Sequence, residues 1–403
     1  MKVPILNVTR QYEKIRSEIE AAVCEQMASG MYIGGAAVER FEKAFAEYIG
    51  VKHAIAVNSG TDALVIAMKA LNIGEGDEVI TTPFTFFATA ETIAMVGAVP
   101  VFADVEEDTY NIDSEQIEEK ITGKTKAILP VHIFGQPAEM GKISAIAKKH
   151  GLKVIEDACQ AVGAEYGGQK VGGIGEIGCF SFYPTKNLGG FGDGGMITTN
   201  SDELAVVCRA YREHGGGQNG AKARSILTGA GDELAGGKVG DALYNPYKYY
   251  NYLIAYNSRL DAIQARILEI KLKYLDEFNA RRTEIAEKYN KAFEGVEGIK
   301  VPVIRNGMKT VWHQYAFRCE EKDKMGEFLA GKEIGSAAFY PVPLHLQKAF
   351  AELGYKEGDL PAAEKITKQT VCLPIFPELT DEEQDAVIEG VKSFFLDRSR
   401  GND

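Results

Sequence analysis

Between residues 74 and 158 the sequence alternates short runs rich in valine and isoleucine with segments of helical periodicity. The apolar runs are EVITT, AVPVF, KAILPV and LKVIED. The first three are followed by the predicted helices TFFATAETIAMVG, SEQIEEKI and MGKISAIAKKHG. Repeats of this kind form a largely parallel sheet with helices on both faces. We therefore predict an α/β fold built on a large, mostly parallel sheet.

Two charged residues follow strands of this predicted sheet. Asp157 ends the run LKVIED, and Lys186 stands 29 residues later (186 − 157 = 29) in SFYPTKNLGGFGDGG, after a strand and a proline bend. Open α/β sheets bind ligands where strands end, so the amine and the carboxylate can meet over one ligand. This pair suits pyridoxal phosphate (PLP), because a lysine binds its aldehyde and an acid keeps its pyridine nitrogen protonated.

A second candidate ligand site lies in HAIAVNSGTDAL, where a predicted strand turns through Ser59 and Gly60 into a helix that begins near Thr61. Free backbone amides and the helix dipole make such a turn a site for phosphate. The alternative is a simple helix cap, since Ser and Thr are favoured there. Phe86, in PFTFFA, follows another strand and can stack on a flat ring, although a core aromatic is the ordinary alternative.

Length and composition limit the function classes. The 403 residues are 45% hydrophobic, which suits two domains, and we predict a large PLP-binding domain over residues 1–275 and a small C-terminal α+β domain over 276–403. The net charge of −12 argues against nucleic-acid and anionic-membrane partners. We find no secretory signal, no membrane-spanning run and no metal-ligand spacing among the six cysteines, so we expect reduced thiols in a cytoplasmic protein without a metal.

Two further segments stand out after residue 200. Nine glycines fall among the 26 residues from Gly215 to Gly240, and we expect a mobile excursion over residues 215–241. Six tyrosines follow between Tyr244 and Tyr256, which suits a cleft or a subunit contact. NSRLDAIQARILEIKLKYLDEF, residues 257–278, has apolar residues at alternating steps of three and four, which predicts one long helix linking the domains.

The motifs SGTDAL, PFTFFATA, EDACQAVGA, SFYPTKNLGGFGDGG and YNSRLDAIQA resemble, in this order, those of the DegT/DnrJ/StrS family of sugar aminotransferases. The resemblance runs from about Asn7 to the C-terminal helix. It implies the fold type I architecture of PLP enzymes. It also implies transfer of an amino group from an amino acid, with glutamate as the expected donor, to a ketone of a nucleotide-linked sugar.

The resemblance also implies roles for individual residues. Lys186 matches the lysine that binds PLP covalently, and Asp157 matches the acid that pairs with the pyridinium nitrogen. Other positions match cofactor ligands, namely Gln160 at the ring hydroxyl, Phe86 stacked on the ring, and Gly60, Thr61 and Ser181 at the phosphate. Asn257 matches an asparagine that reaches the phosphate from the neighbouring subunit, which implies a homodimer with shared active sites.

Several alternatives stay open. Four residues are candidate substrate ligands: Tyr183, Arg259, Tyr340 and His345. Tyr183 and Asp193 look more like the members that act on 3-keto sugars than those that act on 4-keto sugars, but they can equally be lineage differences. A related sugar dehydratase is disfavoured, because those members place a histidine at the position of Lys186. The alternative outside the enzymes is a regulatory protein that binds PLP without turnover.

Overall fold

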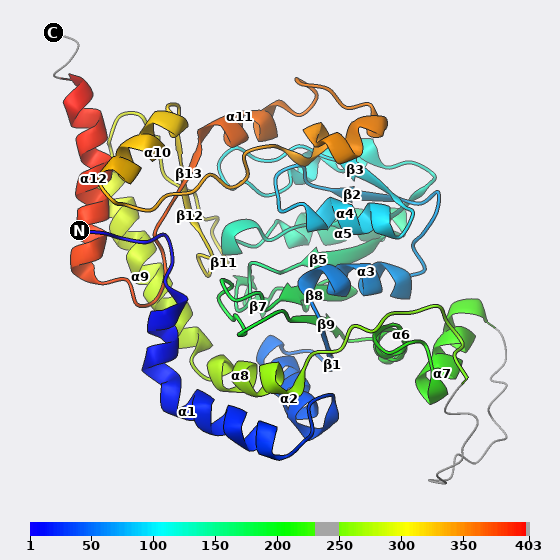
Figure 1. Cartoon of the computed structure of the whole chain (residues 1–403). Helices are drawn as coiled ribbons and strands as arrows, with labels where there is room; N and C mark the ends of the chain where they lie inside the picture. The colour runs from blue at the N-terminus through cyan, green and yellow to red at the C-terminus, as the bar shows by residue number, and fades with distance from the viewer. Residues whose placement is uncertain (230–249, 400–403) are drawn as a thin grey trace.

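The computed structural model describes residues 1–229 and 250–399 (Figure 1). Its centre is a seven-stranded sheet with the order β1-β9-β8-β5-β4-β2-β3. The strands of this sheet are β1 (His53–Val57), β2 (Glu78–Thr81), β3 (Val99–Phe102), β4 (Thr125–Leu129), β5 (Lys153–Asp157), β8 (Ile177–Ser181) and β9 (Gly195–Thr199). Neighbouring strands are parallel from β3 to β8, while β9 runs antiparallel to both β8 and β1. The predicted α/β fold with a mostly parallel sheet is confirmed.

Helices cover both faces of the sheet because its strands are apolar on both sides. In β1, Ile55 and Val57 pack into one core cluster, whereas Ala54 and Ala56 pack into another on the opposite face. This follows from the alternation of side chains along a strand. One face carries α3 (Gly60–Ala70), α4 (Ala88–Met95) and α6 (Asp202–Arg212), and the other carries α2 (Gly35–Ile49), α5 (Met140–His150) and α8 (Ala262–Leu272).

The C-terminal part has a core of its own, around a three-stranded sheet with the order β10-β12-β13. In Figure 1 its helices α9, α10 and α12 stand at one end of the large sheet. The elements are α9 (Leu275–Phe293), β10 (Ile299–Lys300), β12 (Tyr315–Cys319), α10 (Lys322–Gly331), α11 (Pro361–Gln369), β13 (Thr370–Leu373) and α12 (Asp381–Ser399). The described fold also contains small elements, among them β6 (Glu165–Tyr166), β7 (Gln169–Lys170), β11 (Met308–Lys309) and the 3₁₀ turns at 133–135, 344–346 and 348–353.

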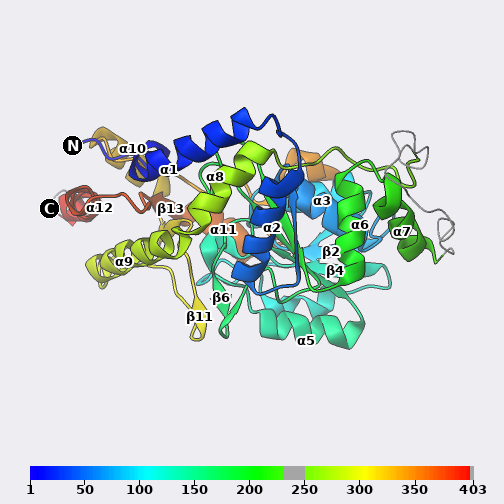
Figure 2. The same ribbon diagram turned by 90° about the horizontal axis from the view of Figure 1, so that it is seen from below.

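The N-terminal residues bridge the two parts of the chain. Val3 is buried in the C-terminal core, where it pairs with Ile334. Helix α1 (Val8–Ala28) then lies alongside α8, as Figure 2 shows, and buries Ile15 and Ile19 against it. The domain boundary between residues 275 and 276 stays a prediction, but the C-terminal core includes residues from the start of the chain.

The single helix predicted over 257–278 is wrong. The chain forms α8 and α9 with a break at Lys273 and Tyr274. The two helices bury their apolar residues in different places, since Ile267 packs against α1 and Tyr289 packs inside the C-terminal core. One straight helix cannot serve both cores, and an apolar stripe alone does not reveal such a change of direction.

The glycine-rich excursion also differs from expectation. Residues 217–228 form helix α7, which packs against α6. Its contact face consists of Gly220, Ala221 and Ala223, so it is made of residues too small to give a clear apolar pattern. A Cβ at Gly220 would lie 2.0 Å from the carbonyl oxygen of Gly215, so only glycine allows this approach. Residues 230–241 of the predicted excursion lie outside the described residues.

The predicted helix SEQIEEKI is likewise wrong, because the segment forms two 3₁₀ turns, Ser114–Gln116 and Glu118–Lys120.

Across residues 1–229 and 250–399, no helix is both long and apolar enough to cross a bilayer. The six cysteines, all within these ranges, form no disulfide. The cytoplasmic location stays a prediction.

Candidate active site

Lys186 and Asp157 come together because β5 and β8 are parallel neighbours. Asp157 ends β5, and its pairing partner on β8 is Cys179, two residues before that strand ends. The chain then bends, and the amide of Lys186 donates to the carbonyl of Tyr183 at 2.8 Å. Both charged residues therefore lie at the carboxyl edge of the sheet, where α/β folds bind ligands.

The carboxylate of Asp157 is buried and oriented by two donors. Thr89 Oγ donates to Oδ2 at 2.8 Å, and the amide of Cys159 donates to Oδ1 at 3.2 Å. Thr89, in the first turns of α4, was missed by the sequence analysis. Its signal was weak, since a threonine near a helix start is ordinarily a cap or a core residue.

The neighbouring Glu156 has a different role. It is fully buried and accepts hydrogen bonds from the amides of Gly172, Ile174 and Gly175 and from His132 Nε2. These donors occupy the lone pairs of both carboxylate oxygens. Glu156 therefore holds the loop before β8 in place, while Asp157 is the carboxylate that faces the site of Lys186.

Burial lowers the pKa of the Lys186 amine from its ordinary value of 10.5. Cys159 and the Asp157 carboxylate act in the opposite direction. Desolvation is the largest cause, because the charged ammonium loses water while the neutral amine loses little. A lysine of this kind is a better nucleophile near neutral pH than a solvated one. Burial and the nearby Asp157 also raise the pKa of the Cys159 thiol well above its ordinary value, which disfavours a nucleophilic cysteine here.

The N-terminus of α3 provides a cradle for an anion. Ser59 Oγ accepts a hydrogen bond from the amide of Asp62 at 3.0 Å, so the amides of Gly60 and Thr61 remain without an intrahelical acceptor. The backbone of Gly60 passes close to β8, where an added Cβ would lie 2.7 Å from the Cβ of Ser181. Glycine is needed at this point for the helix N-terminus to approach Ser181.

Gln160 lies beside two aromatic residues at the same site. Its Nε2 donates to the Tyr340 hydroxyl at 2.9 Å, and its Oε1 accepts from the amide of Phe134 at 2.9 Å. The rings of Phe86 and Tyr340 are 6.4 Å apart, and Phe86 is 57% exposed. Tyr340 comes from the C-terminal part of the chain, so that part helps to close the site.

The other predicted substrate residues lie in varied surroundings. Tyr183 is 53% exposed, while Arg259 pairs with Glu213 at 3.3 Å. His345 is buried, with Nε2 3.1 Å from Glu364. This pairing gives His345 a structural partner, and its role toward a substrate stays a prediction.

Asn257 is exposed on the surface next to the phosphate cradle. The following residue, Ser258, is buried and donates to Asp62 of α3 at 2.6 Å. The segment is therefore anchored to the helix that forms the cradle, while the Asn257 side chain is open to solvent.

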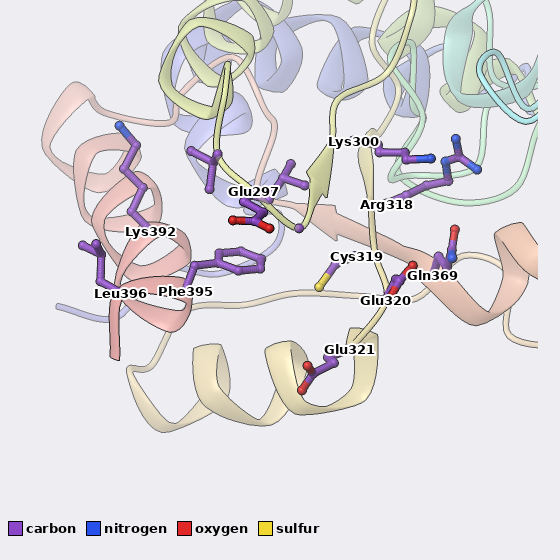
Figure 3. A pocket seen from close by; sticks show the side chains of 13 residues that line it. Glu297, Lys300, Arg318, Cys319, Glu320, Glu321, Gln369, Lys392, Phe395 and Leu396 are labelled. Carbon is purple, nitrogen blue, oxygen red and sulfur yellow. The ribbon is translucent and has the colours of Figure 1, made fainter. Parts of the chain in front are cut away.

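Two cavities lie outside this constellation. One, of about 920 Å³, lies in the C-terminal part, and Figure 3 shows Lys392 and Phe395 of α12 on one side of it and Lys300 on the other. None of its lining residues is a predicted site residue. The other, of about 700 Å³, lies between α1 and the loop after Lys186, and Tyr12 and Phe191 line it.

Comparisons with known proteins agree with this geometry. Residues 13–392 match the model of the DegT/DnrJ/EryC1/StrS aminotransferase family. The chain is 45% identical to a pleiotropic regulatory protein of Geobacillus stearothermophilus, over 98% of this chain and 99% of that protein. It is 38% identical to the dTDP-3-amino-3,4,6-trideoxy-alpha-D-glucose transaminase of Streptomyces venezuelae, over 98% and 96% of the two chains.

Solved structures share the whole architecture. DesV of S. venezuelae, in complex with a ketimine intermediate, superimposes with a TM-score of 0.88 at 38% identity and covers 98% of each chain. NtdA of Bacillus subtilis with bound cofactor PMP, the aminated form of PLP, has a TM-score of 0.84 at 31% identity, over 98% of this chain and 85% of that one. The fold type I architecture is confirmed. The chain belongs to the DegT/DnrJ/EryC1/StrS aminotransferase family, whose members are PLP-dependent sugar transaminases.

Proposed function

We propose that this protein transfers an amino group from glutamate to the C3 ketone of a nucleotide-linked sugar. The observation that carries the proposal is the placement of Lys186, in the bend after β8, near Asp157, at the end of the neighbouring strand β5. This placement suits chemistry that needs an amine nucleophile and a fixed negative charge over one flat ring.

The residues of the site fit PLP. The amides of Gly60 and Thr61, with Ser181 next to them, suit its phosphate, and the exposed ring of Phe86 is free to stack on its pyridine. Asp157 would pair with the pyridine nitrogen, Gln160 would lie at the ring hydroxyl, and Lys186 would bind the aldehyde. When bound, PLP supplies an electron-accepting ring that stabilises negative charge on the substrate carbon.

The chain's own residues supply charge and proton transfer. The Asp157 carboxylate is oriented by Thr89 and the amide of Cys159, and it would keep the ring nitrogen of bound PLP protonated. With PLP bound, the Lys186 amine would act as general base toward the substrate carbon and then as general acid toward the cofactor carbon. Its lowered pKa favours the neutral amine that this step requires.

Substrate selection is assigned to residues around this centre. Tyr340 lies against Gln160 and Phe86, and this supports a role for its hydroxyl toward the substrate. Tyr183, exposed three residues before Lys186, is proposed to orient the sugar for amination at C3. Arg259 and His345 remain candidates for the donor carboxylate.

We further propose a homodimer in which Asn257 reaches the phosphate site of the partner. The exposure of Asn257 supports this, because a side chain that reaches a ligand in the partner must project from the surface of its own subunit. Large apolar side chains are also exposed near it, including Tyr256 and the fully exposed Ile254. Exposed patches of this kind are typical of protein interfaces.

The test is to load the purified protein with PLP and add glutamate, with matched 3-keto and 4-keto nucleotide sugars to follow. The proposal expects release of 2-oxoglutarate, conversion of the cofactor absorption to that of its aminated form, and faster consumption of that form by the 3-keto sugar. Preference for the 4-keto sugar would support the alternative regiochemistry.

A regulatory protein without turnover is the second candidate, because the Geobacillus relative is named a pleiotropic regulatory protein. The same experiment separates the two. If PLP binds at Lys186 but glutamate produces no spectral change and no 2-oxoglutarate, the regulatory function is favoured.

A further inference from the structure

A chain of side-chain amides connects the residue after Lys186 to the start of α9. Asn187 is buried, and its Nδ2 donates to Asn279 Oδ1 at 2.8 Å and to the carbonyl of Val311 at 2.8 Å. Asn279 Nδ2 donates in turn to the carbonyl of Val162 at 3.1 Å. The chain thus joins the lysine loop, the helix α9 and the segment that precedes β12.

The two backbone carbonyls fix the orientation of both amides. A carbonyl oxygen only accepts hydrogen bonds, so the Asn279 atom that faces Val162 must be its nitrogen, and its oxygen must face Asn187. For the same reason the Asn187 atom that faces Val311 must be its nitrogen. The oxygen of Asn187 is therefore left to face the third neighbour, His313.

This oxygen determines where the proton of His313 lies. His313 Nδ1 is 3.2 Å from Asn187 Oδ1, and because the amide oxygen only accepts, Nδ1 must carry a hydrogen. Burial lowers the pKa of His313 well below its ordinary value, and the nearby charges of Lys186 and Arg282 lower it further. The ring is thus neutral, its one proton lies on Nδ1, and Nε2 has a free lone pair.

His313 lies close to the catalytic lysine in the fold, because its imidazole contacts Asn187, the residue that follows Lys186. Burial is the main cause of the lowered pKa of His313, and the charge of Lys186 lowers this pKa more than the charge of Arg282 does. Among the described residues, Nε2 of His313 makes no hydrogen bond. Arg282 directs its Nη1 elsewhere, to the carbonyls of Trp312 and Ile375.

We propose that Asn187 and Asn279 are positioning residues that hold His313 as the Nδ1–H tautomer, so that Nε2 accepts a hydrogen bond from the Lys186 amine while that amine carries a proton. No proton passes to His313. With PLP bound, Lys186 would carry the proton from the substrate carbon to the cofactor carbon, and His313 would orient the ammonium between these two transfers. The inference rests on the proposed function, because it needs Lys186 to be the amine that moves the proton.

The direct test is the tautomer of His313 in the PLP-loaded protein. Long-range ¹H–¹⁵N spectra of protein labelled at the histidine rings separate protonated from unprotonated ring nitrogens, and the chain has only six histidines. The His313 signals are identified by their loss in His313→Gln or, if that variant does not fold, by their shift in Asn187→Leu. At pH 7 we expect a protonated Nδ1 and an unprotonated Nε2. A protonated Nε2 would overturn the proposal.

The variant Asn187→Leu tests whether the amide sets this tautomer. It removes the oxygen while keeping a similar volume, so His313 should no longer favour Nδ1–H. The rate constant of the glutamate half-reaction should fall about tenfold or more, with little change in the glutamate concentration that gives half the maximal rate. An unchanged tautomer or an unchanged rate constant in a folded Asn187→Leu protein would refute the positioning role.

Gln384→Leu is the matched control. Gln384 is a buried amide in the C-terminal part, and its Nε2 donates to the carbonyl of Ile285 at 2.7 Å. Its loss should change stability but leave the His313 tautomer and the half-reaction unchanged, whereas equal effects from both variants would indicate a structural role only. Failure of the proposed function gives a different result: wild-type protein would show no half-reaction with glutamate, although the tautomer could still be read.

Discussion

Replacing Asp157 with asparagine should separate catalysis from folding at this site. The side chain has two donors, the hydroxyl of Thr89 and the amide of Cys159. An asparagine can keep its oxygen on the Cys159 amide and turn its nitrogen toward Thr89, whose own hydrogen can turn to Thr85 Oγ at 3.1 Å. The hydrogen-bond count is preserved, so we expect the free energy of unfolding to change by about 1 kcal/mol or less.

The loss of charge should have a much larger effect on the reaction. Asp157 is proposed to keep the pyridine nitrogen protonated, and removing one electrostatic stabiliser in an enzyme site costs about 2.7 to 4 kcal/mol, or 10²-fold to 10³-fold in kcat. The assay is the rate of the glutamate half-reaction, followed by the cofactor absorption in a stopped-flow instrument. A rate within a factor of a few of the wild type would refute the role.

Glu156→Gln is the matched comparison, one residue away. All four partners of Glu156 are donors, because His132 Nδ1 accepts from the amide of Ala138 and its Nε2 must therefore carry the hydrogen that faces Glu156. Whichever way the glutamine turns, its nitrogen faces two donors, which should destabilise the fold by at least about 2 kcal/mol. We expect this variant to lose stability first and Asp157→Asn to lose activity first.

Three further predictions concern single lysines and the dimer. Lys186→Ala should abolish turnover and the borohydride-reducible link to PLP, and a reducible adduct in this variant, found by mass spectrometry, would contradict the assignment. Mixing Lys186→Ala with Asn257→Asp subunits should restore some activity, because hybrids contain one site with both residues intact; no recovery in verified heterodimers would place each site within one chain. Lys271, whose pKa burial lowers to about 8 from 10.5, should make the free energy of unfolding rise by about 3 kcal/mol between pH 8 and pH 10.5, since the unfolded chain there holds a proton that the folded one has released. Denaturant titrations should show that this rise is absent in Lys271→Met, and an equal rise in both proteins would exclude Lys271 as its source.

The central sheet and its catalytic edge could be predicted from the sequence because both depend on local patterns. Strand and helix periods repeat over residues 74–158, and strand ends gather at one edge, so the proximity of Asp157 and Lys186 follows from topology. The break between α8 and α9 could not be predicted in this way. It depends on which distant surface each half of the helix packs against, and the apolar stripe is the same in either case.

Contacts between residues far apart in the sequence could not be predicted from local sequence patterns either. Thr89 and Asp157 are 68 residues apart, and Asn187 and His313 are 126 apart. Each looks ordinary in its own segment, and only the packing of the C-terminal part against the large sheet brings His313 to the lysine loop. Helix α7 was not predicted, because its buried face is made of glycine and alanine and the sequence therefore shows no clear apolar periodicity there.

The most direct test of the proposed function follows the nitrogen atom itself. The PLP-loaded protein is incubated with ¹⁵N-glutamate and a 3-keto nucleotide sugar, and the product is examined by NMR. The account predicts a ¹⁵N amine bonded to C3 of the sugar, formed by the wild type and lost in Lys186→Ala. Label that remains in glutamate with both 3-keto and 4-keto sugars, or that appears only at C4, would contradict it.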